Sequence, residues 1–149
     1  MNAKELWDKF CKDKNIDKKT KFESWQFGEN PNELAELVMR GIKTATASAY
    51  DLYKYDNEQF PHVGDYSVIL NDKNQAVCII RTTKLYVKQF NKVTEEHASK
   101  EGEKDRTLLS WRAIHKKFFK EEYKKYPIKF TEESNVLCEE FTLEYCIDG

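Results

Sequence analysis

The chain has 149 residues, of which 40% are hydrophobic and 13% aromatic, enough to bury one sizeable core but hardly two. A single domain over residues 1–149 is therefore expected. The 25 basic and 26 acidic residues give a formal net charge of −1, so a protein that coats a polyanion through its overall charge is not expected. This charge neither predicts nor excludes nucleic acid, and any anion site must come from local clustering.

No stretch is long and apolar enough to span a membrane, and the N-terminus lacks the apolar core of a signal peptide. A soluble, cytoplasmic protein is expected. The four cysteines form no C-x-x-C pair and the three histidines lack the spacing of metal ligands. The sequence therefore predicts free thiols, no metal and no cofactor.

Two helices are predicted in the first third of the chain. Over about residues 2–13, Asn2 and Glu5 have the spacing of a capping box before a narrow apolar stripe. A lysine-rich, exposed connection follows. The second helix begins at Asn30-Pro31, a capping residue before a helix-starting proline, and ends at Gly41.

Strands and helices alternate in the remaining sequence. Strands at residues 66–70 and from 76 to about 87 are joined by a polar turn and predict a hairpin. Helices are expected over residues 93–101 and along the apolar stripe from Leu108 to Tyr123. A late strand with alternating apolar residues runs from Leu137 to Ile147. This order is typical of the α+β class.

The segment from Gly41 to Ser48 places one lysine among three hydroxyl residues, directly after a helix end. If the segment is a strand, Lys43 lies on one face and Thr46 on the other, whereas in a bent loop the two side chains converge on one cavity. A lysine that loses its proton in an apolar pocket can activate a hydroxyl as a nucleophile. A solvated lysine beside small packing residues is the simpler interpretation.

Three motifs resemble, in their order and spacing, those of the ASCH domain family. They are Gly41-x-Lys43-Thr44-x-Thr46, a Val-Gly-Asp turn into a strand, and Thr94-Glu95-Glu96-His97-Ala98-x-x-Glu101. The resemblance covers roughly residues 22–147, and the stretch Phe27-Gly28-x-Asn30-Pro31 with Trp111 and Phe118-Phe119 suggests the larger bacterial subgroup. It implies a PUA-like fold, a small mixed β-barrel with flanking helices and a cleft, to which residues 2–13 add a helix. It also implies nucleosides or RNA as ligands.

Some small ASCH proteins are N(4)-acetylcytidine amidohydrolases, and the resemblance places their proposed catalytic group at Lys43, Thr46 and Glu101. Thr46 would be the nucleophile, Lys43 a base or oxyanion stabiliser, and Glu101 an acid/base, a role that a pKa raised by burial would suit. The small enzymes carry an arginine where this chain has Ser48, and the loss of that cation can alter the choice of substrate. The alternatives are a non-catalytic RNA-binding or regulatory module in the same cleft and a metal-independent ribonuclease.

Five further residues are candidates for binding the substrate. Tyr50 lies in the loop nearest the motif and can stack on a base, which is worth about 1–3 kcal/mol. Arg81, a charge amid apolar residues, can bind a phosphate or pair with a carboxylate. The set comprises Phe27, Thr44, Ser48, Tyr50 and Arg81. The expected partners are a modified nucleoside or RNA, without a membrane or a metal, and the sequence leaves the oligomeric state open.

Overall fold

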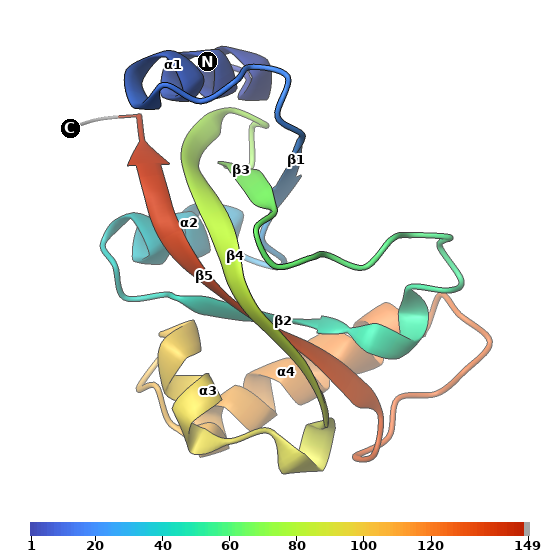
Figure 1. The fold of residues 1–149 in the computed structure, drawn as a ribbon. Helices are drawn as coiled ribbons and strands as arrows, with labels where there is room; N and C mark the ends of the chain where they lie inside the picture. Colours follow the sequence, from blue (N-terminus) through green and yellow to red (C-terminus); the bar gives the residue numbers. More distant parts are fainter. Residues whose placement is uncertain (148–149) are drawn as a thin grey trace.

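A curled five-stranded sheet forms the centre of the computed structural model, which describes residues 1–147 (Figure 1). The order of the strands in the sheet is β1-β3-β4-β5-β2. β1 runs parallel to β3, and the other neighbouring pairs are antiparallel. The strands are β1 (Phe22–Gln26), β2 (Ala45–Ala49), β3 (Tyr66–Leu70), β4 (Ala76–Gln89) and β5 (Asn135–Cys146).

The long ladder between β4 and β5 gives the sheet its curl. It extends from Cys78 opposite Cys146 to Gln89 opposite Asn135, and its register shifts at two places along the way. Such bulges bend a strand and increase its twist. The sheet therefore curls into a half-barrel, with the short strands β1 and β2 at its two edges (Figure 1). This is the predicted α+β, PUA-like architecture.

Four α-helices lie against the sheet within residues 1–147: α1 (Ala3–Lys14), α2 (Pro31–Met39), α3 (Glu95–Glu101) and α4 (Leu108–Tyr123). The predicted capping box is present, because the Asn2 side chain accepts a hydrogen bond from the Glu5 backbone N–H while the Glu5 carboxylate accepts one from the Asn2 backbone N–H. None of the helices within residues 1–147 has the length and apolar character that crossing a membrane requires.

Two local predictions need correction. Asn30 stands at the N-cap of α2, but its side chain makes no capping hydrogen bond, because its ψ of 70° departs from the extended conformation that a cap requires. Leu143 is 37% exposed, although the alternation of the late strand predicted a core position. The apolar pattern of β5 is buried mainly in its first half, where α4 covers the strand.

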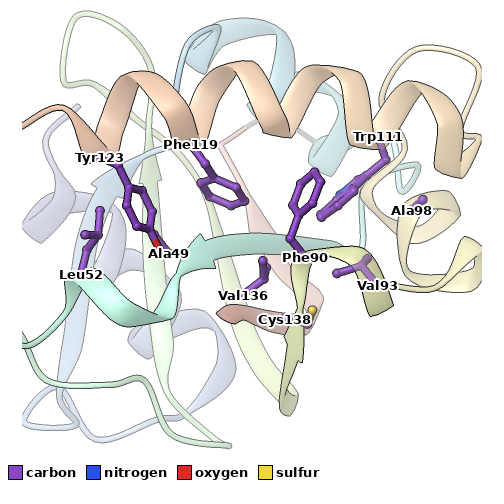
Figure 2. Packing of buried hydrophobic residues seen from close by; sticks show 10 residues of the cluster. All are labelled: Ala49, Leu52, Phe90, Val93, Ala98, Trp111, Phe119, Tyr123, Val136 and Cys138. Atoms are coloured by element: carbon purple, nitrogen blue, oxygen red, sulfur yellow. The ribbon is translucent and has the colours of Figure 1, made fainter. Parts of the chain in front are cut away.

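A cluster of buried side chains joins α4 to the sheet (Figure 2). Trp111, Phe119 and Tyr123 point from α4 toward β2 and β5. Ala49 of β2 belongs to this cluster and Ala47 packs against it. Because side chains alternate along a strand, Thr46 and Ser48, which alternate with the alanines of β2, face the opposite side of the sheet.

Candidate functional site

A cleft of about 750 Å³ lies inside the curl of the sheet. β1 and the Phe27-Gly28 turn form one side of it, while β2 and residues 52–62 form the other. Four neighbouring strands each contribute a polar side chain to the lining. These residues are Thr46 from β2, Ser67 from β3, Thr82 from β4 and Glu139 from β5.

Aromatic rings form much of the rest of the lining. Trp25 and Phe27 meet edge to face with their ring centroids 4.9 Å apart. On the other side, Tyr53 and Phe60 stack with their centroids 4.7 Å apart. Aromatic walls beside a few polar groups suit a planar ligand that has hydrogen-bonding edges.

Glu139 is the half-buried carboxyl group among the polar residues of the cleft. Its Oε2 accepts a hydrogen bond of 2.6 Å from the Thr82 hydroxyl. Burial raises the pKa of Glu139, the Thr82 hydrogen bond opposes this shift, and the negative charge of Asp65 adds to it. Glu139 is paired with Thr46 in the β2–β5 register, and both residues line the cleft. Directly paired residues have Cβ atoms about 4.5–5.5 Å apart.

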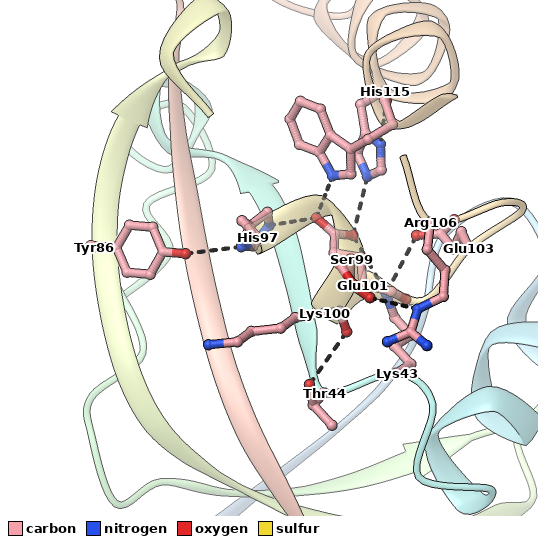
Figure 3. A network of polar contacts seen from close by, with 11 residues as sticks. Lys43, Thr44, Tyr86, His97, Ser99, Lys100, Glu101, Glu103, Arg106 and His115 are labelled. Carbon is pink, nitrogen blue, oxygen red and sulfur yellow. Dashed lines mark hydrogen bonds and ion pairs between the residues drawn. The ribbon is translucent and has the colours of Figure 1, made fainter. Parts of the chain in front are cut away.

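A second group of polar residues lies between α3, α4 and the segment before β2 (Figure 3). Lys43 is buried there, with its Nζ 3.4 Å from each of three oxygens: Glu101 O, Glu101 Oε1 and Glu103 Oε2. Three acceptors match the three N–H donors of an ammonium group. The Lys43 side chain is therefore held within this network. Its Nζ also lies 5.4 Å from the centroid of the Phe27 ring, which lines the cleft.

Glu101 is the centre of this buried network. Its Oε2 accepts hydrogen bonds of 2.6 Å from both His97 Nε2 and Trp111 Nε1, while its Oε1 faces Lys43 and His115. Burial alone would raise the pKa of Glu101, but the charges of Lys43 and His115 outweigh it and hold the pKa well below its ordinary value. The pKa of Glu101 is thus lowered, whereas the role of an acid would require a raised pKa. Glu101 is therefore an ionised hydrogen-bond acceptor.

His115 and Glu103 complete the charge balance of the network. His115 Nδ1 donates to the Trp111 carbonyl at 2.9 Å, and its Nε2 lies 3.3 Å from Glu101 Oε1. Burial lowers the pKa of His115, but Glu101 outweighs that effect and raises it. Burial also raises the pKa of Glu103, against the positive charge of Lys43. One firmly held carboxylate is thus surrounded by cations and hydrogen-bond donors.

The Glu101, Glu103 and His115 side chains also have the composition of a metal site. One ligand atom from each lies within 4.8 Å of the others. However, the Lys43 ammonium group contacts both carboxylates. The lysine thus supplies the positive charge that a metal ion would bring.

The structure separates the three residues predicted to be catalytic. Thr46, within β2, lines the cleft, whereas Lys43 precedes the start of β2 at Ala45 and is paired with Glu101 in the buried network. Neither alternative describes the whole segment, because only residues 45–49 form a strand and Lys43 and Thr46 do not converge on one cavity. Within residues 1–147, no polar contact joins Lys43 to Thr46. Of the predicted binding residues, Phe27 and Ser48 line the cleft, and the Ser48 hydroxyl lies 2.8 Å from the Tyr53 hydroxyl.

Three other predicted residues lie outside the cleft lining. Both the backbone N–H and the hydroxyl of Thr44 are directed to the Lys100 carbonyl at the end of α3. Tyr50 stacks on Phe60, with their ring centroids 4.7 Å apart. Arg81 is exposed, lies over the Tyr66 ring and donates to a backbone carbonyl. The Arg81 side chain is thus exposed and lies outside the cleft.

Sequence reasoning missed Glu139 and its partner Thr82. A signal was present for Glu139, because the Glu139-Glu140 pair directly follows the apolar run Val136-Leu137-Cys138 on β5. Thr82 carried no such signal, since the contact between the two side chains spans 57 residues of sequence. Glu103 lies in a polar loop and was likewise missed.

The chain belongs to the ASCH domain family, whose model matches residues 23–145. The ASCH domain from Lactobacillus crispatus JV V101 is 30% identical, with a TM-score of 0.88 over 95% of this chain and 94% of that one. A protein from Enterococcus faecalis V583 is 35% identical, with a TM-score of 0.87 over 97% of this chain and 89% of that one. No curated protein matches the chain significantly.

Proposed function

We propose that this ASCH domain binds an acylated nucleoside in the cleft and hydrolyses its amide bond, with Thr46 as the nucleophile. The observation that carries the proposal is the place of Thr46, which lines an aromatic-walled cleft of about 750 Å³. This volume lies within the range of about 300–1,000 Å³ that is usual for small-ligand sites. A hydroxyl in such a cleft can attack a bound carbonyl carbon.

The charges of the cleft favour a nucleoside over RNA. Its lining carries six carboxyl groups and one lysine, so it offers little attraction to a phosphate backbone. The acidic residues are Glu23, Asp56, Glu58, Asp65, Glu122 and Glu139. An uncharged base can stack on the aromatic walls while its amide edge meets the polar side chains. This distribution argues for the small-substrate hypothesis over the RNA-binding module and the ribonuclease.

Lys43 and Glu101 have a positioning role in this proposal. Their ion pair ties the segment before β2 to the end of α3, and the backbone hydrogen bond from Thr44 N–H to the Lys100 carbonyl, 2.7 Å long, reinforces this connection. The start of β2, and with it Thr46, is thereby fixed beside the cleft. In the alternative role as a base, Lys43 would have to leave its two carboxylates and lose a proton.

Conversion of N(4)-acetylcytidine to cytidine, followed by chromatography, tests the proposal. Thr46→Ala should abolish turnover while ligand binding, measured by a rise in melting temperature, is kept. Thr83→Ala is the matched control, because Thr83 is exposed on β4 and its hydroxyl donates to the Glu140 backbone carbonyl. Full activity of Thr46→Ala would contradict the proposal. Saturable binding by a wild-type protein that converts no acylated nucleoside would favour the non-catalytic module.

A further inference from the structure

We infer that Glu139 is the general base and general acid of this hydrolysis, which takes the proton of Thr46 and returns it to the departing nitrogen. The inference rests on the proposed function and deepens it by assigning the proton transfers. It gives a catalytic role to a residue outside the Lys43, Thr46 and Glu101 group.

The sheet register brings Glu139 to Thr46. The two residues are paired across the β2–β5 ladder and both line the cleft, so their side chains project from the same face. Within residues 1–147, neither Thr46 Oγ1 nor Glu139 Oε1 has a hydrogen-bond partner. The Thr82 hydroxyl holds the other carboxyl oxygen, Oε2, at 2.6 Å, and Thr82 is itself buried with 2% exposure. The carboxyl group is thus oriented by one oxygen while the other stays available.

The surroundings of Glu139 suit proton transfer better than those of Lys43 or Glu101. A catalytic acid/base works best when its pKa lies near the working pH. Burial shifts the pKa of Glu139 upward in this direction, whereas the buried network holds Glu101 ionised. Lys43 Nζ is held by three oxygens of the buried network, and among the described residues it makes no polar contact with Thr46.

The reaction balances without a cofactor. Glu139 Oε1 takes the proton of Thr46 Oγ1 as that oxygen forms a bond to the amide carbon. The carbon–nitrogen bond then breaks, and Glu139 returns the proton to the nitrogen, which leaves the amine and an acylated Thr46. A water molecule next attacks the ester carbon while Glu139 takes its proton. The carbon–oxygen bond to Thr46 breaks, and the proton passes to Oγ1, which releases the carboxylic acid and restores both residues.

Glu139→Gln tests the assignment, because it keeps the size and the Thr82 contact but cannot exchange a proton. Using the N(4)-acetylcytidine assay, we expect kcat to fall by about 10²–10⁴-fold, with KM changed little. The acid limb of the pH profile of kcat/KM should also disappear. Glu140→Gln is the matched control: Glu140 adjoins Glu139 in sequence but pairs with Lys100 outside the cleft, so its substitution should change kcat less than twofold.

Thr82→Val provides an independent readout that keeps the carboxyl group. The Thr82 hydrogen bond lowers the pKa of Glu139, so its removal should move the acid limb to higher pH. Among the charged groups that line the cleft, Asp65 acts on the pKa of Glu139. The others are Lys21, Glu23, Asp56, Glu58, His62 and Glu122, and all are unchanged in this variant.

The outcomes separate the inference from the proposed function. If Thr46→Ala is inactive but Glu139→Gln keeps its kcat and acid limb, Glu139 is not the acid/base while the hydrolase stands. A rise in KM alone would make Glu139 a binding contact and overturn the inference. Wild-type protein that converts no acylated nucleoside would overturn both. If Glu139→Gln does not fold, Glu139→Asp tests the inference instead. This variant keeps a carboxyl group, so the acid limb should remain while kcat is reduced.

Discussion

Thr46 and Glu139 are paired across the β2–β5 ladder, and both side chains line the cleft. Lys43 is only three residues from Thr46, yet it lies in a buried network with Glu101 and Glu103. Lys43 precedes the start of β2 and is held at the end of α3, whereas Thr46 lies within β2, where the alanines pack under α4 and Thr46 faces the other way. The structure thus contains a cleft and a separate charged support beside it.

Removal of the Lys43 charge should strongly destabilise the fold. Lys43→Met leaves Glu101 and Glu103 without their shared cation, and loss of one partner of a buried ion pair costs about 3–5 kcal/mol. Urea unfolding measures this change. Lys100→Met is the control, because Lys100 pairs with two carboxylates at a partly exposed site and should cost at most about 1 kcal/mol. Equal effects of the two substitutions would contradict the role of the network.

Stability should fall at acid pH because of Glu101. Its folded-state pKa lies below its unfolded value, so its contribution is present above the unfolded pKa, about 4.5, and is lost as pH falls through the folded pKa. Urea unfolding at a series of pH values should show this decline. The same series on Glu101→Gln, which has no such group to titrate, should decline less steeply over this range. Parallel curves for the two proteins would count against the assignment.

His115 should make the opposite contribution. Its pKa is raised on folding, so its stabilisation is complete below the unfolded value of about 6.5 and is lost as pH rises through the folded pKa. The stability difference between wild type and His115→Gln should therefore shrink as pH increases from 6. His62→Gln, at an exposed position, provides the comparison and should show little difference at any of these pH values. A constant difference for His115→Gln would show that its role is packing alone.

The acidic lining predicts discrimination against phosphate. Cytidine should raise the melting temperature more than cytidine 5′-monophosphate at equal concentration, because the carboxylates repel the phosphate dianion. Added salt should narrow the gap by screening that repulsion. Tighter binding of the monophosphate at low salt would instead favour the RNA-binding alternative.

Two glycines with left-handed backbones offer a test of the contact between α3 and the Lys43 segment. Gly41 and Gly102 have φ values of +77° and +75°, but only Gly102 is crowded: a Cβ there would lie 2.8 Å from the Ile42 carbonyl oxygen. Gly41→Ala should cost about 1–2 kcal/mol for the backbone alone. Gly102→Ala should cost clearly more in urea unfolding. Similar losses of stability for the two variants would mean that Ile42 can move away from the added Cβ at little cost.

Local signals were sufficient to predict much of the fold. The capping box at Asn2 and the alternating strands of the hairpin are short-range patterns, and the corresponding elements formed near the expected residues. β1 was not predicted, because Glu23 and Ser24 interrupt its apolar pattern and its pairing partner, β3, is distant in sequence. Trp111 was expected in the core and is 3% exposed, but its hydrogen bond to Glu101 was not foreseen.

The site was harder to predict because its contacts are non-local. The Gly41–Ser48 motif identified Thr46 and Lys43, but the sequence left open whether they converge, and the start of β2 at Ala45 places them apart. Glu139 approaches Thr46 only through the pairing of β5 with β2. That pairing joins strands about ninety residues apart, which no single-sequence pattern reveals.

The central claim is that the Thr46 hydroxyl attacks the substrate, and detection of an acylated Thr46 tests it most directly. Wild-type protein mixed with N(4)-acetylcytidine, quenched rapidly in acid and digested, should yield the Thr46 peptide with one added acetyl group; Thr46→Ala should yield none. Cytidine release by Thr46→Ala at the wild-type rate, with no acetylated peptide from either protein, would show that Thr46 is not the nucleophile.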